Sequence, residues 1–299
     1  MKGFLCILFI LVFYHVSYSQ DRVMDSIVNA RKTELLPGKI PVSYTVGYKS
    51  RAKVLQQAFE NAASFYETKY RKQFKVRLAV LDSIQWPATE IPYGIVAYYG
   101  GWAMIPTNFS YNNFLRLYGI EGKEDKFREF LKDNHITGDD LISSVFFVFS
   151  LHELGHYFAL DLNNEQVPDM FANEMIATYF SVNYLKRTNS KALSQVILFS
   201  KFIRQSYKAE HHKIGDMDSL FNRMPVPNFK WYHCNIVLLC NEVYKKKSGA
   251  FIDDYLTLFA KGTPNKYTTA EVVSLLNDHT GGAVQKWVDG LAAYKPPAD

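Results

Sequence analysis

The sequence predicts an α+β fold with a small N-terminal mixed sheet and helices, a mainly helical C-terminal half, and the motif-bearing helix between them. Within the first hundred residues, two stretches of alternating apolar and polar residues flank a long helical pattern, as in a strand–helix–strand unit. From Ser110 onward the apolar residues recur at helical spacing. Residues 145–161 form an apolar run that contains two histidines and a glutamate. These three observations define the fold class.

Composition indicates a well-packed protein without a nucleic-acid partner. Hydrophobic residues make up 48% of the 299 positions and aromatic residues 15%, which argues against disorder. The net charge is only +5 and no long basic run occurs, so nucleic acid is not an expected partner. Cys234 and Cys240, six residues apart on an expected helix, would point to different sides and are not expected to form a disulfide.

The first 19 residues are typical of a secretory signal peptide. Lys2 supplies the positive charge, residues 4–16 the apolar core, and Ser17-Tyr18-Ser19 a small-x-small cleavage site. The alternative is an uncleaved membrane anchor, but the apolar run is short for a span and lacks charge on its far side. We therefore expect a secreted, periplasmic or extracellular protein that is not membrane-bound after cleavage.

The mature chain, residues 20–299, is expected to form a single domain with an α/β half at about 20–136 and a helical half at about 137–299. Its elements are expected in order along the chain. They are a short amphipathic helix within 21–35, a strand at 42–48, a helix at 50–70 and a second strand at 74–80.

Residues 93–106 are expected to form a hairpin or a bent edge strand, with Gly100-Gly101 as the turn. Glycines in a strand also allow another backbone to approach closely. An ordinary hairpin and a substrate-binding strand, in which a peptide pairs along residues 94–105, remain equally open.

The second half is expected to be helical throughout. A charged helix is expected at 123–133, and Thr137-Gly-Asp-Asp140 is a plausible N-cap for the motif helix, which ends near Leu160. Further helical patterns follow at about 169–187, 190–208, 230–247, 250–261, 268–278 and 282–293.

The motif helix carries His152-Glu153-Leu154-Gly155-His156. On a helix, two histidines four residues apart lie on one face about 6 Å from each other, which suits two nitrogen ligands of one zinc ion. Glu153 can reach a water on the metal without being a ligand. The alternative is a chance motif on an exposed helix, but neither x position is charged and the flanking residues are apolar.

A catalytic zinc site needs a third protein ligand. A continuation with a third histidine would place glycine at 159 and histidine at 162, where the chain has Ala159 and Leu162. Asp161 would point away on a continuing helix. Glu174 opens a new apolar helix, and a helix–loop–antiparallel helix could return it to the histidines. Its alternative role is that of an acidic residue favoured by the helix dipole.

The motif at 152–156, together with Asn173-Glu174-x-x-Ala177, resembles the gluzincin branch of the zincin metallopeptidases, which contains thermolysin-like enzymes and zinc aminopeptidases. The likeness is close over residues 140–185 and loose upstream. It implies a zincin-like fold with one Zn²⁺ and a general base. The implied zinc ligands are His152, His156 and Glu174, and the implied base is Glu153.

In these enzymes a tyrosine or histidine further along the chain stabilises the oxyanion. Lys230-Trp231-Tyr232-His233 offers both. Tyr232, followed by Asn235, resembles a Tyr-x-x-Gly pattern of some relatives and is preferred to His233, although either could serve packing alone.

Two positions depart from the family pattern. Thermolysin-like enzymes have an aspartate where this chain has Thr178, so another group is expected to orient the ligand histidine. In the segment Gly101-Trp-Ala-Met104-Ile105, the aminopeptidases of this group have a glutamate at the position of Ile105. The absence of this glutamate favours an endopeptidase.

The sequence thus predicts a secreted zinc metallopeptidase that hydrolyses peptide bonds in peptide or protein substrates. The alternatives are an aminopeptidase, a zinc-containing peptide-binding protein without turnover, or a structural zinc. Glu153 argues against the peptide-binding protein, because a binder needs no base there. The open fourth coordination position expected of a His, His, Glu set argues against a structural zinc.

Overall fold

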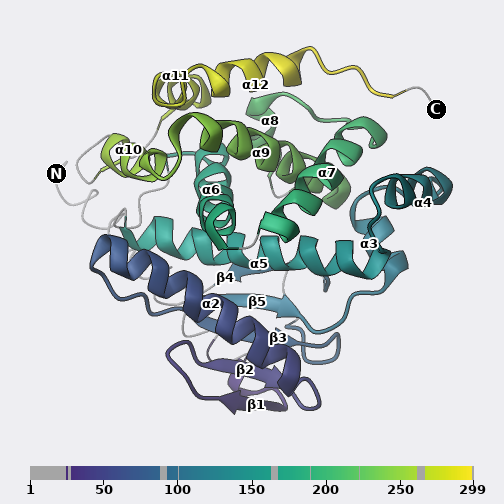
Figure 1. The fold of residues 1–299 in the computed structure, drawn as a ribbon, viewed down its shortest axis with the longest axis vertical. Coiled ribbons are helices and arrows are strands. Elements are labelled where there is room, and N and C mark those ends of the chain that lie inside the picture. Colours follow the sequence, from purple (N-terminus) through teal and green to yellow (C-terminus); the bar gives the residue numbers. More distant parts are fainter. Residues whose placement is uncertain are drawn as a thin grey trace, which may run out of the picture. The chain divides into compact units, whose positions relative to one another are not determined.

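The computed structural model describes residues 25, 28–87, 93–99, 101–162, 168–188, 190–221, 223–260 and 267–297. The chain divides into two compact units, Met1–Asn108 and Phe109–Asp299 (Figure 1). The first contains a small mixed sheet and the second is helical, so the expected α+β class is confirmed. The expected signal peptide and its cleavage site lie outside the described residues.

A five-stranded sheet with the order β1-β2-β3-β5-β4 forms the centre of the first unit. Strands β2, β3 and β5 run parallel, and each edge strand is antiparallel to its neighbour. The strands are β1 (Thr33–Leu36), β2 (Val42–Thr45), β3 (Arg77–Leu81), β4 (Ala97–Tyr99) and β5 (Trp102–Pro106).

Helix α2 (Lys49–Tyr70) connects β2 to β3 and packs against β1, β2 and β3. Its apolar stripe, which includes Leu55, Phe59 and Tyr66, is buried. Ala79 and Leu81 of β3 belong to a hydrophobic cluster with Trp86 and Met104, whereas their sequence neighbours point to the opposite face of the sheet. Both faces are therefore covered, which explains why β3 and β5 are almost continuously apolar.

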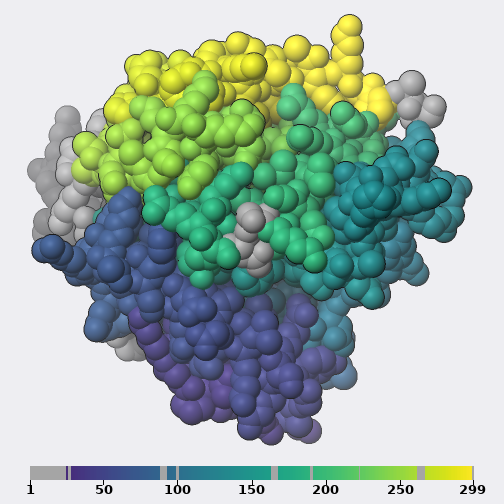
Figure 2. All heavy atoms as spheres, viewed as in Figure 1, coloured from purple at the N-terminus to yellow at the C-terminus, as the bar shows by residue number. Residues whose placement is uncertain are grey.

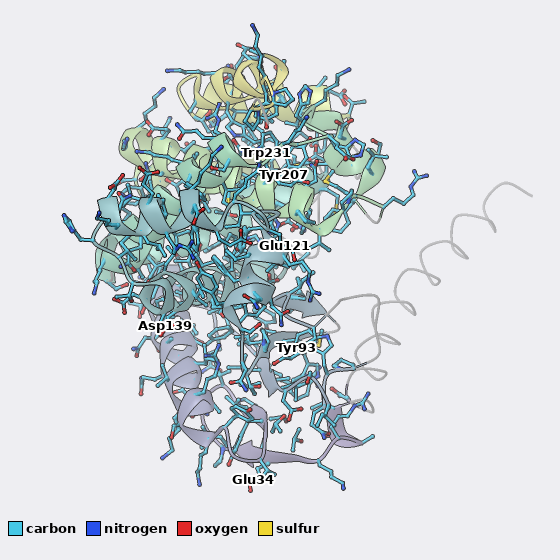
Figure 3. The ribbon with its side chains drawn as sticks, turned by 90° about the vertical axis from the view of Figure 1, so that its right-hand side faces the viewer. Glu34, Tyr93, Glu121, Asp139, Tyr207 and Trp231 are labelled. Carbon is cyan, nitrogen blue, oxygen red and sulfur yellow. The ribbon has the colours of Figure 1, made fainter. Side chains whose placement is uncertain are left out.

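The prediction of a helix within 21–35 is wrong for the C-terminal end of this range. Val28 and Asn29 are helical, but Thr33–Leu36 pairs with β2 as an edge strand. Glu34 (Figure 3) accepts a hydrogen bond from the Tyr44 hydroxyl across this pair. Cross-strand pairing with the nearby β2 outweighs the weak helical pattern of these residues.

The expected hairpin is confirmed. Tyr99 lies opposite Trp102, and Gly101 has a φ of 74°, a conformation that glycine adopts readily. Strand β4 is an edge of the described sheet, whereas β5 is paired on both sides. Pairing of a peptide along 94–105 stays a prediction.

The second unit consists of packed helices, and in Figure 2 its C-terminal residues, coloured yellow-green to yellow, form a continuous layer over one side of it. Two short helices, at 111–117 and 214–220, were not predicted individually, and the helices whose ranges the sequence predicted are confirmed. The helices of this unit follow in order along the chain. They are α3 (Tyr111–Leu117), α4 (Glu124–Asp133), α5 (Gly138–Leu162), α6 (Met170–Thr188), α7 (Ser190–Ser206), α8 (Ile214–Leu220), α9 (Val226–Lys247), α10 (Ala250–Leu258), α11 (Thr269–His279) and α12 (Ala283–Ala292).

The boundary between the units lies after Asn108, earlier than the boundary near residue 136 that the sequence suggests. Aromatic contacts explain the difference. Phe127 and Phe130 of α4 pack on Phe202 of α7, with ring centroids 5.6 and 4.7 Å apart. Helices α3 and α4 therefore belong to the helical core and not to the sheet.

Helix α5 is the centre of the second unit and packs on α3, α6 and α7. Helix α9 packs on α6 and α7 and contributes Trp231 (Figure 3), which is buried with its ring 5.0 Å from that of Tyr294. In the described part of the chain, no helix has the length and apolar character that a membrane span requires.

Close contact between α5 and α6 occurs at Gly155. A Cβ atom added to this residue would lie 2.3 Å from the Ala177 carbonyl oxygen. Only glycine therefore allows the two backbones this separation, and the separation determines where the side chains of α6 stand relative to those of α5.

We expect Gly155→Ala to destabilise the protein by about 1–3 kcal/mol, because the new methyl group overpacks a helix–helix contact and must push the backbones apart. Chemical denaturation measures the change. The control is Gly215→Ala in exposed α8, where no atom lies within 4 Å of the added Cβ and the substitution should be neutral or stabilise by about 0.5–1 kcal/mol. Equal stability of Gly155→Ala and wild type would contradict the importance of this contact.

Candidate metal centre

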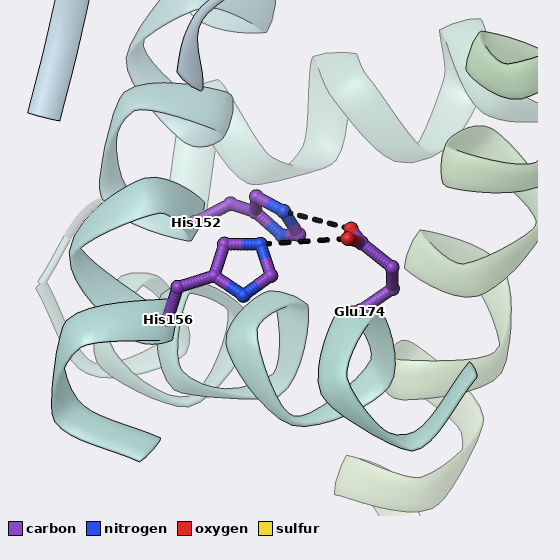
Figure 4. A group of neighbouring side chains, drawn as sticks. All are labelled: His152, His156 and Glu174. Carbon is purple, nitrogen blue, oxygen red and sulfur yellow. Dashed lines mark ion pairs between the residues drawn. The ribbon is translucent and has the colours of Figure 1, made fainter. Parts of the chain in front are cut away.

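His152 and His156 of α5 converge with Glu174 of α6 in one buried group (Figure 4). One ligand atom from each residue lies within 4.8 Å of the others. Glu174 Oε2 is 3.2 Å from His152 Nε2, and Glu174 Oε1 is 3.6 Å from His156 Nε2. The structure thus brings together the three residues that the sequence pattern assigned to a metal, and this group could hold an ion.

The distances within this group suit a small divalent cation. Ligand atoms at 2.0–2.1 Å from a tetrahedral ion lie about 3.3 Å from one another, close to the 3.2 and 3.6 Å observed. His152 Nε2 and Glu174 Oε2 are also buried, and neither has a hydrogen-bond partner among the described residues. Buried polar atoms without partners are costly, and a cation between them would satisfy both. The donor set therefore fits a metal ion.

Two polar residues of α6 orient the histidine rings. His152 Nδ1 lies 2.9 Å from Thr178 Oγ1, and His156 Nδ1 lies 3.3 Å from Asn173 Oδ1. With Nε2 as the ligand nitrogen, Nδ1 carries the proton and donates to these oxygens. The expectation that a group other than Thr178 orients the imidazole is wrong, because the shorter side chain reaches the ring from the closely packed α6.

Burial and mutual charges set the protonation of the group. Burial, reinforced by His156, lowers the pKa of His152 to about 3. Burial acts in the same direction on His156, but Glu174 and Glu153 outweigh it and raise its pKa to about 9. Burial opposes ionisation of Glu174, but the facing histidines hold its pKa well below the usual range. A metal thus finds an ionised carboxylate and a neutral His152, and displaces a proton from His156.

Glu153 follows His152 on α5 and is buried, yet it is not a member of the group of ligand atoms. Its carboxylate lies close enough to His156 and to Lys230 to influence the charge of both. The residue is thus placed beside the donors and not among them.

The preference for Tyr232 over His233 is not supported. The Tyr232 hydroxyl donates to the Lys213 carbonyl oxygen at 2.8 Å, and burial followed by Asp216 raises the Tyr232 pKa. His233 Nε2 lies 3.0 Å from Glu174 Oε2, and its ring stacks on Phe149. Neighbouring residues of a helix point about 100° apart, so only one of the two can face the donors.

Sequence reasoning missed Lys230, which lies one turn before His233 on the same face of α9. Its side chain is only 3% exposed, and Nζ lies 5.3 Å from the Phe149 ring centroid. Burial lowers the Lys230 pKa, while Glu153 and Glu174 oppose the shift. The available signal was the (i, i+3) spacing of a lysine and a histidine in an apolar helix.

We expect Thr178→Val to weaken zinc binding about 10- to 100-fold, because it keeps the side-chain shape but removes the oxygen that orients His152. Thr178→Ser keeps the oxygen and should bind as wild type does. Competition with a chromophoric chelator measures the zinc affinities of both variants and of the wild type. We expect the wild type to bind one ion per chain. Equal affinity of the valine variant would show that Thr178 has no orienting role.

No protein-family model matches the sequence, and no curated protein matches it. The function is therefore inferred from the residues of the site.

Proposed function

We propose that the chain is a zinc-dependent metallopeptidase of the gluzincin kind that hydrolyses peptide bonds. His152, His156 and Glu174 would hold one Zn²⁺, and Glu153 would act as general base. The observation that carries this proposal is the buried convergence of the three donors with Glu153 beside them but outside the ligand group. The signal-like first 19 residues support a secreted enzyme.

The donor chemistry favours zinc over harder cations. Two imidazole nitrogens and one carboxylate form a set typical of catalytic zinc, whereas Mg²⁺ and Ca²⁺ prefer oxygen ligands. Among the described residues, the group of mutually close donors contains no fourth protein ligand. The set thus leaves one coordination position for water or substrate, as hydrolysis requires.

Bound zinc supplies an activated water and polarises the scissile carbonyl group. Glu153 accepts the proton that the water loses as its oxygen adds to the carbonyl carbon. It then returns this proton to the amine nitrogen when the carbon–nitrogen bond breaks. His233 contacts Glu174 and helps to hold its carboxylate toward the histidines.

A structural metal site is the second candidate, and one observation favours it. His233 Nε2 lies 3.0 Å from Glu174 Oε2, and in the part of the chain that the structure describes neither buried atom has a hydrogen-bond partner. A small movement of this ring would make it a fourth ligand and close the coordination sphere. Structural zinc sites have four protein ligands of this kind.

The catalytic proposal predicts that a diverse peptide library is cleaved by the wild type and not by Glu153→Gln. Loss of the base should lower the rate by at least about 10²- to 10⁴-fold, while zinc content stays at one ion per chain. Mass spectrometry of the digest identifies the cut bonds. Internal cuts indicate an endopeptidase, and removal of single N-terminal residues indicates an aminopeptidase. Equal cleavage by both proteins would exclude Glu153 as the base.

X-ray absorption of the zinc-loaded protein separates the catalytic from the structural candidate. We expect two imidazoles per zinc in the wild type and two in His233→Ala, since this histidine is not a member of the ligand group. Three imidazoles in the wild type, falling to two in the variant, would instead establish a closed site and contradict the proposed enzyme.

A further inference from the structure

We propose that Lys230 is the anion-binding residue of this centre, whose ammonium takes up the negative charge that forms on the scissile carbonyl oxygen. The inference rests on the proposed function and adds to it a group outside the metal ligands and the general base.

Lys230 is a buried residue whose ammonium group has no direct partner among the residues that the structure describes. Only 3% of the residue is exposed. Within the described residues, no hydrogen bond or ion pair reaches its Nζ, although Glu153 and Glu174 lie within range of its charge. Burial of an ammonium group is costly unless an anion or hydrogen-bond acceptor compensates it. The position thus suits an acceptor that the described residues do not themselves provide.

Aromatic rings hold the Lys230 side chain in place. Its Nζ lies 5.3 Å from the ring centroid of Phe149 and 5.8 Å from that of Phe229. Each ring attracts the cation, but such contacts are weak and do not replace an anion or a hydrogen-bond acceptor. The Phe149 ring also stacks on His233 at 5.6 Å and lies 6.1 Å from His152. The same ring therefore contacts the ammonium group and borders the metal centre.

Helix geometry places this cation beside the turn of α5 that carries Glu153. Phe149 lies one turn before Glu153 on α5, so a group over the Phe149 ring is adjacent to the turn that carries the general base. Of the charges that act on Lys230, the Glu153 carboxylate has the largest effect, followed by Glu174. The ammonium group is thus near the base and the donors but beyond ion-pair contact with either.

The other candidate donors are engaged. The Tyr232 hydroxyl donates to the Lys213 carbonyl oxygen, and His233 Nε2 lies against Glu174 Oε2.

The charge balance of the site agrees with the assignment of Lys230 as the anion-binding residue. A divalent ion and the Lys230 ammonium bring three positive charges against the carboxylates of Glu153 and Glu174, so one further negative charge would be accommodated.

In the proposed step, the water oxygen bonds to the carbonyl carbon, its proton passes to Glu153, and the carbonyl π electrons move onto oxygen. Lys230 Nζ–H donates a hydrogen bond to that oxygen and keeps its proton. When the carbonyl re-forms, the carbon–nitrogen bond breaks and Glu153 protonates the leaving amine. Removal of one such donor typically lowers kcat about 10²- to 10³-fold.

The test compares Lys230→Met, which keeps length without charge, with Lys230→Arg, which keeps charge. We expect the methionine variant to retain one zinc per chain and an unchanged KM, while kcat falls about 10²- to 10³-fold. The arginine variant should recover part of kcat. Lys201→Met, at an exposed position of α7, is the matched control and should behave as wild type.

A second readout does not require turnover. Azide titrated into the cobalt-loaded protein and followed by visible absorption should bind at least about 10-fold more weakly to Lys230→Met, a loss of 1.4 kcal/mol. Unchanged azide affinity together with unchanged kcat would overturn the proposal. If the wild type cleaves nothing but azide affinity still depends on Lys230, the anion site stands and the peptidase proposal fails. If Lys230→Met does not fold, Lys230→Gln, which keeps a polar end without charge, replaces it; azide affinity at least about 10-fold below wild type supports the assignment, and equal affinity contradicts it.

Discussion

The metal centre depends on the approach of α5 to α6 at Gly155. This contact leaves no room for a Cβ atom against the Ala177 carbonyl oxygen, and it brings Glu174 and Thr178 of α6 within reach of the histidine rings. One pair of packed helices therefore supplies both the ligand atoms and the group that orients His152. Because the two helices are closely packed here, the fold itself places the donors at distances that suit a metal ion.

A second constraint is electrostatic. The donors, Glu153 and Lys230 are all buried, so each charge must be compensated by another charge or by a bound ion. Glu174 interacts with three histidines at once. The site is thus a network in which the charge of each residue is set by the others. Its functional states are best described for the whole group and not residue by residue.

Local patterns predicted the donors, whereas their partners depended on tertiary packing. The spacing of His152 and His156 and the helix that starts before Glu174 are properties of short segments, and α2, β2, β3 and the hairpin also followed from local periodicity. The choice between Tyr232 and His233 depends on the rotation of α9 about its axis, which neighbouring helices decide. The same rotation buries Lys230 at the site. Thr178 could not be assigned because its role requires the close approach of α6.

The donors also share a property of position along the chain. His152, His156 and Glu174 all belong to one helix–connection–helix segment, α5 with α6. The loop that an ion would close between the two helices is short, and short loops lose little entropy on closure. A metal ion bound by these donors would therefore couple its uptake to the docking of these two helices. An ion that arrives during folding would thus help to assemble the helical core around itself.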